Sequence, residues 1–378
     1  MRFLEFKQPL REMEARIQHA EDLIFFQGSA GASRAIEALR SMTGDNHKAV
    51  TLKWDGSPAI VFGRDENGTF VFTDKGGFMK KGGVERATSP KEINSVLLGR
   101  SGGKHKDDPN RIAFAKNMAN IFSMYEKATP KNYRGFFKGD LLYYQTPQIK
   151  ENYYIFKPQI VQYAVYKDSE LGKRIGQSMT GIVIHREVDA SGNEGPFKNI
   201  DIFQSQTTVL VVPSITTTQP VKVNTGALDQ LQLMAKKNAA SIDKLLDSNT
   251  LTQKQMKGFP DLLYAYMNSK VDSGLTNLGS DFIPWLENRE QVSAKMKTKV
   301  NEYIQENSSA FMSLWNVVSS IMKTKDDIIN KFDSQESPIK QSINGKPGGE
   351  GYVMAHPKGD IKLVPRSTFS AANRSATR

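Results

Sequence analysis

Hydrophobic and polar residues alternate with two different periods along this chain. From residue 10 to residue 43, and again from about residue 225 to residue 332, apolar residues recur at helical spacing, as in LDQLQLMAKKNAASIDKLL. Between residues 50 and 78, and from GFFKGDLLYY to TTVLVVPS, short apolar runs joined by turns such as DENG are typical of β-strands. Helical stretches near PKEINSVLLG and RIAFAKNMANIFSMYEKA interrupt these strands. The pattern predicts an α+β protein with antiparallel sheets.

The order of the stretches predicts one domain interrupted by another. Strand signals resume after residue 335, at EGYVMAHPKGDIKLVPR. We therefore expect a β-rich domain made of residues 1–222 and 336–378, with an all-helical insertion at residues 223–335. The cluster GSAGAS, which opens at Gly28, lacks the Gly-Lys-Ser/Thr end of a phosphate loop, so helix capping is the preferred interpretation there.

Composition narrows the classes of function. The 378 residues include no cysteine, which excludes disulfides, thiolate metal sites and a thiol nucleophile. No apolar run approaches the roughly 18 residues that a membrane span needs, so we expect a cytoplasmic protein without membrane association. The net charge of +11 fits either a polyanionic partner such as nucleic acid or a merely basic surface. Because residues 223–335 contain 13 basic and 13 acidic residues, the whole excess lies elsewhere in the chain.

A lysine at the end of an apolar strand raises the first chemical question. Lys53 lies in the stretch VTLKWDGSPAIVFG, and a buried amine is costly unless it is paired or its charge is used. Lys-x-Asp-Gly by itself is expected by chance in roughly one chain of this length in ten. The glycine that follows Asp55 permits a tight turn or the close approach of a ligand.

Two later stretches carry carboxylates and lysines in a similar setting. FFKGDLLYY places Asp140 at the edge of a core strand. GGEGYVMAHPKGDIKLVPR places Glu350 before a strand, with Lys358 and Lys362 on either side of the following turn. Carboxylates hold Mg²⁺ and lysines neutralise phosphate oxygens, so this set of residues suits a nucleoside triphosphate with magnesium.

Taken in order, four stretches resemble the signature motifs of the covalent nucleotidyltransferase superfamily: KWDG (residues 53–56), KGDLLYY (138–144), EGYVM (350–354) and DIKLV (360–364). That superfamily comprises ATP-dependent DNA ligases, RNA ligases and mRNA capping enzymes. The resemblance implies an antiparallel-sheet adenylation domain with ATP and Mg²⁺ as cofactors. It covers the ends of residues 50–365 but not the helical segment, and it is specific mainly through the order of the motifs.

The resemblance also implies a role for each matched residue. Lys53 would attack the α-phosphate of ATP as the free amine, forming lysyl-AMP and releasing pyrophosphate. Lys358 and Lys362 would hold the phosphates, and Lys362 fits the family pattern better. Glu350 would bind magnesium together with Asp140, which takes the place of the usual glutamate. The rest of the nucleotide site would consist of Thr51, Asp55, Gly56 and one adenine-stacking aromatic among Phe156, Tyr163 and Tyr166, each of which is equally suited to a core.

Besides Asp140, the sequence departs from the family pattern in two places, and one further stretch competes with a motif. Pro58 stands where many DNA ligases have an arginine, and this departure favours an RNA ligase. The stretch TGIVIHRE, from Thr180, competes with the Glu350 motif, but no lysine-bearing strand follows it at short range. The chain ends 16 residues after Lys362, which leaves no room for an oligonucleotide-binding barrel and disfavours a capping enzyme.

Basic residues of the β-rich part are the predicted contacts with a nucleic-acid backbone. They are Arg64, Lys75, Lys80, Lys81, Arg86, Arg100, Lys104 and Lys106. The helical segment, which carries no net charge, would grip a duplex together with the β-rich part or bind a protein partner. We expect the protein to be a monomer.

These expectations converge on an ATP-dependent polynucleotide ligase that seals breaks between a 5′-phosphate and a 3′-hydroxyl. Nicked duplex DNA is slightly preferred, and an RNA ligase is the first alternative. Two others are a non-catalytic nucleic-acid-binding protein on a degenerate ligase scaffold and an enzyme that transfers AMP to a protein. NAD is the less favoured AMP donor, because the 52 residues before Lys53 contain no recognised dinucleotide motif.

Overall fold

The computed structural model describes residues 18–43, 50–80, 85–104, 106–189, 193–197, 200–203, 207–213, 215, 221–222, 225–355 and 359–377. The chain forms two compact units and passes between them more than once. Unit 1 consists of Met1–Lys53, Ile215–Glu336 and Glu350–Arg378, and unit 2 consists of Trp54–Ser214 and Ser337–Gly349. The boundary between the units therefore falls inside the KWDG motif, directly after Lys53.

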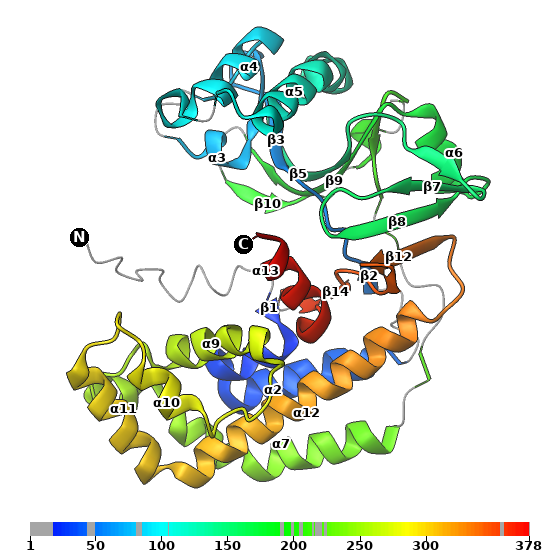
Figure 1. Ribbon diagram of the computed structural model, residues 1–378. Helices are drawn as coiled ribbons and strands as arrows, with labels where there is room; N and C mark the ends of the chain where they lie inside the picture. The colour runs from blue at the N-terminus through cyan, green and yellow to red at the C-terminus, as the bar shows by residue number, and fades with distance from the viewer. Residues whose placement is uncertain are drawn as a thin grey trace. The chain divides into compact units, whose positions relative to one another are not determined.

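Unit 1 combines a helical core with a four-stranded sheet (Figure 1). The strands are β1 (Gln18–His19), β2 (Val50–Leu52), β14 (Tyr352–Met354) and β15 (Ile361–Leu363), in the order β1-β15-β14-β2. The β1–β15 pair is parallel and the other two pairs are antiparallel. The helical elements are η1 (Ala20–Asp22), α2 (Leu23–Ser41), α7 (Thr225–Leu245), α8 (Ser248–Gln253), α9 (Phe259–Ser269), η6 (Lys270–Ser273), α10 (Phe282–Glu287), α11 (Ala294–Glu306), α12 (Ser308–Asp333), η7 (Arg366–Ser370) and α13 (Ala371–Thr377).

The core of unit 1 joins segments from both ends of the chain. Helices α2, α7 and α12 lie side by side (Figure 1). In α12 the residues Phe311, Leu314, Trp315, Val318 and Ile321 are buried at helical spacing, and they share one hydrophobic cluster with the apolar residues of α2 and of strands β14 and β15. Residues 223–335 therefore do not form a core of their own, which differs from the predicted insertion. The reason is that the apolar side of α2 and one face of the sheet pack against these helices.

Helix α2 bends at Gly28, which adopts a left-handed conformation with φ of 57°. A Cβ atom at this position would lie 2.4 Å from Oδ1 of Asp243 in α7, so glycine is required. The Asp243 carboxylate accepts hydrogen bonds from the amide and the hydroxyl of Ser29, both at 2.7 Å. The stretch GSAGAS thus begins a capped helical segment, as the sequence predicted, but the cap comes from another helix.

Unit 2 contains two sheets (Figure 1). The six-stranded sheet has the order β10-β9-β5-β3-β4, with β11 paired to β9. Its strands are β3 (Ala59–Arg64), β4 (Phe70–Asp74), β5 (Gly135–Tyr143), β9 (Thr180–Val188), β10 (Glu194–Pro196) and β11 (Val209–Val211). The five-stranded sheet has the order β13-β12-β8-β7-β6, and its strands are β6 (Gln148–Lys150), β7 (Tyr153–Phe156), β8 (Val161–Tyr166), β12 (Ile339–Ile343) and β13 (Lys346–Pro347).

Helices cover one face of the six-stranded sheet. The helical elements of unit 2 are α3 (Lys75–Phe78), α4 (Pro90–Gly99), η4 (Arg100–Gly103), α5 (Pro109–Ala128), α6 (Glu170–Gln177) and η5 (Ile200–Phe203). Apolar residues of α4 and α5 pack on Ile60, Phe62 and Phe137 of the sheet. Ser89 and Asp108 cap the two helices through side-chain hydrogen bonds, and each cap is followed by a proline at the first helical position.

The secondary structure confirms the predicted mixture of helices and largely antiparallel sheets. The stretches GFFKGDLLYY, NYYIFKP, IVQYAVYK and TGIVIHREV form β5, β7, β8 and β9, and these pair antiparallel within their sheets. No helix among the described residues has the length and apolar character of a membrane span.

Candidate functional site

Lys53 and Glu350 form an ion pair within unit 1. Strand β2 pairs with β14, and the Lys53 amide extends this ladder by donating to the Gly351 carbonyl at 2.9 Å. The Lys53 Nζ atom lies 2.5 Å from Oε1 of Glu350, and the side chains are 18% and 14% exposed. Two residues almost 300 positions apart are thus brought together, as the order of the motifs predicted.

The polar face of the small sheet also carries Thr51 and Lys362. Thr51 is paired with Val353, and Val353 is paired with Lys362. Directly paired residues point to the same face, and Lys53 follows Thr51 by two positions, which also favours that face. The opposite face presents Tyr352, Met354, Ile361 and Leu363 to the helical core. The alternation of apolar and polar residues in these strands therefore positions both lysines on one side of the sheet.

His19 is a residue at this sheet that sequence reasoning missed. It is paired with Lys362 across the β1–β15 ladder. Burial, together with the positive charges of Arg366, Lys325 and Lys362, holds the pKa of His19 well below its ordinary value. The imidazole beside Lys362 is thereby kept neutral. Nothing in the amphipathic N-terminal sequence indicated that His19 pairs with Lys362.

Asp55 has a structural position in unit 2. Its carboxylate is buried and Oδ2 accepts hydrogen bonds from the amides of Ile160 and Val161, each at 3.3 Å. The Asp55 amide donates to the Tyr163 hydroxyl at 2.6 Å. These contacts fix the backbone that follows Lys53, whereas the sequence placed Asp55 at the ribose or the lysine.

The three candidate aromatics for adenine differ in exposure. Phe156 and Tyr163 are buried, and their rings stack at 5.3 Å between centroids. Trp54 packs on Tyr163 at 4.7 Å, so the side chain after Lys53 anchors the motif in an aromatic cluster. Tyr166 is 39% exposed. The core interpretation fits Phe156 and Tyr163, and Tyr166 has the accessible ring.

Gly56 lies against the Asp140 motif of the same unit. A Cβ atom at Gly56 would lie 2.7 Å from Cβ of Asp140, so the close approach of the two motifs requires glycine. Asp140 Oδ2 is 3.0 Å from Nε2 of His185. His185 belongs to TGIVIHREV, the stretch that competed with the Glu350 motif, and it here provides a partner for the Asp140 carboxylate.

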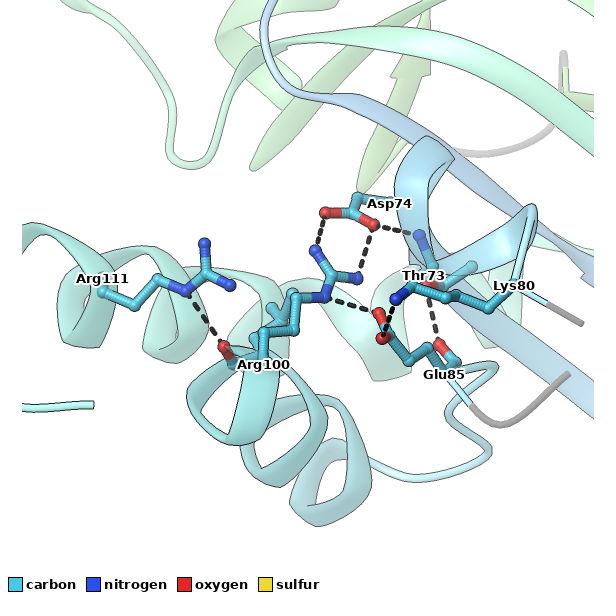
Figure 2. A network of polar contacts seen from close by, with 8 residues as sticks. Thr73, Asp74, Lys80, Glu85, Arg100 and Arg111 are labelled. Carbon is cyan, nitrogen blue, oxygen red and sulfur yellow. Dashed lines mark hydrogen bonds and ion pairs between the residues drawn. The ribbon is translucent and has the colours of Figure 1, made fainter. Parts of the chain in front are cut away.

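Two of the predicted nucleic-acid contacts, Arg64 and Arg100, each have several internal partners. Arg64 is 9% exposed, and its guanidinium donates to the carbonyls of Gly68, Glu126, Thr129 and Pro130. Figure 2 shows Arg100 in contact with two acids. It makes a bidentate pair with Asp74, and its Nε lies 2.6 Å from Glu85. A phosphate would have to displace these partners, so both arginines act first as supports of unit 2.

The other predicted basic residues vary in setting. Lys80 lies 3.6 Å from Glu85 (Figure 2). Lys75, Arg86, Lys104 and Lys106 are exposed, and Arg86 lies 4.3 Å above the Phe78 ring. Lys81 and Lys358 lie outside the described residues.

The two predicted magnesium ligands belong to different units, Glu350 to unit 1 and Asp140 to unit 2. Within the described ranges, no three His, Asp or Glu side chains gather closely enough to hold a metal ion. A hard cation that keeps most of its water ligands needs only one or two carboxylates, so Glu350 remains the candidate ligand in unit 1.

The fold and the site define a two-unit α+β protein with a lysine–glutamate pair on the polar face of a small sheet. The chain belongs to DUF6267, a family of unknown function, whose model matches residues 14–378. Comparison with curated proteins and with solved structures gave no match.

Proposed function

We propose that this protein is an ATP-dependent adenylyltransferase of the polynucleotide-ligase type, with Lys53 as the residue that carries AMP. The observation that carries this proposal is the 2.5 Å pair of Lys53 and Glu350 on the same sheet as Lys362. In that arrangement Lys53 is a nucleophile once it loses its proton, and Lys362 offers a positive charge to phosphate oxygens.

These positions are compatible with the following first step. The Lys53 amine attacks the α-phosphorus of ATP, a nitrogen–phosphorus bond forms, and the bond to pyrophosphate breaks. Only the neutral amine of Lys53 is a nucleophile, so the ion pair with Glu350 must open before the attack. Magnesium bound with ATP supplies charge neutralisation at the phosphates, and Glu350 is the carboxylate suited to it. Transfer of AMP to a 5′-phosphate and attack by a 3′-hydroxyl would complete ligation.

Incubation with α-labelled ATP and Mg²⁺ tests the first step. We expect the label to stay on the full-length protein after denaturation. The Lys53→Ala variant should lose about 95% of the label or more, because it lacks the proposed nucleophile. Lys237→Ala, which removes an exposed lysine of α7, is the matched control and should keep the label. A wild-type protein that takes up no label, or a Lys53→Ala variant that keeps it, contradicts the proposal.

The acceptor is tested with nicked duplex DNA, nicked RNA and protein, using pre-adenylated enzyme. We expect AMP to pass to a 5′-phosphate and the nick in DNA to be sealed. Sealing of RNA alone would reassign the substrate to RNA. Adenylation of protein alone would replace the ligase by a protein AMP-transferase.

A further inference from the structure

The face of the six-stranded sheet opposite α4 and α5 carries a cluster of cations. Lys138 of β5 is paired with Arg186 of β9, so both side chains belong to one face. Both reach the carboxylate of Glu194 in β10: Lys138 in direct contact, and Arg186 with its Nε 2.7 Å from Oε1. Two cations therefore hold one carboxylate.

A β-bulge shapes this face. Lys138 is paired with Arg186, but the next residue, Gly139, is paired with Ile184, so His185 is an extra residue in β9. A bulge re-aims side chains and is common beside functional sites. Here His185 reaches Asp140 at 3.0 Å and Arg186 reaches Glu194, so two consecutive residues contact groups of the same face.

Further cations come from the segment after β4. The Phe78 ring is contacted by two cations from different segments: Lys138 Nζ lies 5.6 Å from the ring centre, and the Arg86 guanidinium lies 4.3 Å from it. Lys75, one turn before Phe78, is exposed. Burial would raise the pKa of Glu194, but the contact with Lys138 and the charges of Arg186 and Lys75 outweigh it and lower that pKa. The acids of this segment, Asp74 and Glu85, are engaged by Arg100 (Figure 2).

We propose that Lys75, Arg86, Lys138 and Arg186 form a phosphate-binding surface for the backbone of a polynucleotide, and that the Glu194 carboxylate occupies its centre until a phosphate replaces it. A carboxylate and a phosphate are interchangeable partners for a lysine and an arginine, because both offer charged oxygens to the same donors. The geometry to Arg186 is imperfect, since its Nε has no aligned hydrogen-bond acceptor among the described residues despite the short distance. Because the four cations come from three separate segments rather than one loop, they suit an extended backbone better than a single anion. This inference rests on the proposed function for its choice of polynucleotide.

Binding of a fluorescent oligonucleotide without ATP or magnesium tests the surface separately from Lys53 chemistry. We expect Glu194→Gln to bind about three- to tenfold more tightly, because it removes the competing carboxylate. Lys138→Met and Arg186→Met should each bind about tenfold more weakly and lower the salt dependence, d log K/d log[salt], by about one. Asp168→Asn and Lys167→Met are matched controls that change charge by the same amount in an exposed pair of unit 2, and both should bind like the wild type.

The controls and competitors decide between outcomes. Thermal unfolding of each variant identifies a folding defect, and Lys75→Met, which alters only an exposed side chain, tests the surface if Lys138→Met unfolds. Equal affinity of Glu194→Gln and Asp168→Asn would overturn the proposal. So would binding of inorganic tripolyphosphate or ATP with no binding of oligonucleotide, since this would assign the surface to a nucleotide. Lysyl-AMP formation is measured in parallel in the wild type and in the Lys138→Met and Arg186→Met variants. If the wild type forms no lysyl-AMP, the proposed function is contradicted, whereas the binding surface is not.

Discussion

Unit 1 contains two clusters of charges that differ mainly in burial. Lys53 and Glu350 are 18% and 14% exposed on the polar face of the small sheet. Lys325 of α12 and Glu21 of η1 are fully buried, their charged groups lie 2.8 Å apart, and Arg366 is 1% exposed with its Nε 2.8 Å from Glu21. Lys325 also donates to the Val364 carbonyl, directly after β15. A charge pair must stay partly exposed to contact a ligand, as Lys53 and Glu350 do, whereas the buried cluster around Glu21 holds segments of the fold together.

The largest expected effect concerns the buried cluster. Lys325→Met should lower the free energy of unfolding by about 3–5 kcal/mol, because Glu21 loses a buried counter-charge. Lys53→Met should lower it by only about 1 kcal/mol, since water reaches the partner that is left behind. Urea unfolding of the two variants measures both values. Similar losses for the two would remove the distinction between the clusters.

The acid stability of the fold should depend on the same cluster. Burial alone would raise the pKa of Glu21, but Lys325 and Arg366 outweigh it and lower that pKa to about 2. A carboxylate with a depressed pKa stabilises the fold above its ordinary pKa of about 4.5, and this contribution is lost as pH falls towards 2. Asp22, whose pKa burial raises to about 7, titrates above this window. The free energy of unfolding of the wild type should therefore fall by about 2–3 kcal/mol between pH 5 and about pH 2, and this decrease should be absent in Glu21→Gln. The same decrease in the variant would contradict this role of Glu21.

A smaller effect is expected at Asp55. Because its carboxylate accepts two buried amide hydrogen bonds, Asp55→Ala should destabilise the protein by about 1–3 kcal/mol. The exposed Asp168, replaced in the same way, should cost about 0.5 kcal/mol or less. Calorimetry of both variants makes the comparison. A stable Asp55→Ala protein would favour a direct role in nucleotide binding over the support of the motif.

Sequence reasoning recovered features that depend on local pattern. Strands such as β3, β5 and β9 follow from alternating apolar residues, and the meeting of Lys53 with Glu350 follows from the order of motifs on neighbouring strands. The domain division could not be obtained in that way, since it depends on the packing of α2 against helices more than 180 residues later. The internal partners of Arg64 and Arg100 and the bulge at His185 are also tertiary features. A basic residue in a loop looks the same in sequence whether or not an acid lies beside it in the fold.

The central claim is that Lys53 becomes covalently adenylated. Mass spectrometry of peptides from protein incubated with ATP and Mg²⁺ measures this directly, and added pyrophosphate tests whether the bond reverses. The proposed chemistry predicts AMP on the peptide that contains Lys53, its removal by pyrophosphate, and at least about tenfold less of it in Glu350→Gln. AMP on another lysine, or on none, would contradict the claim.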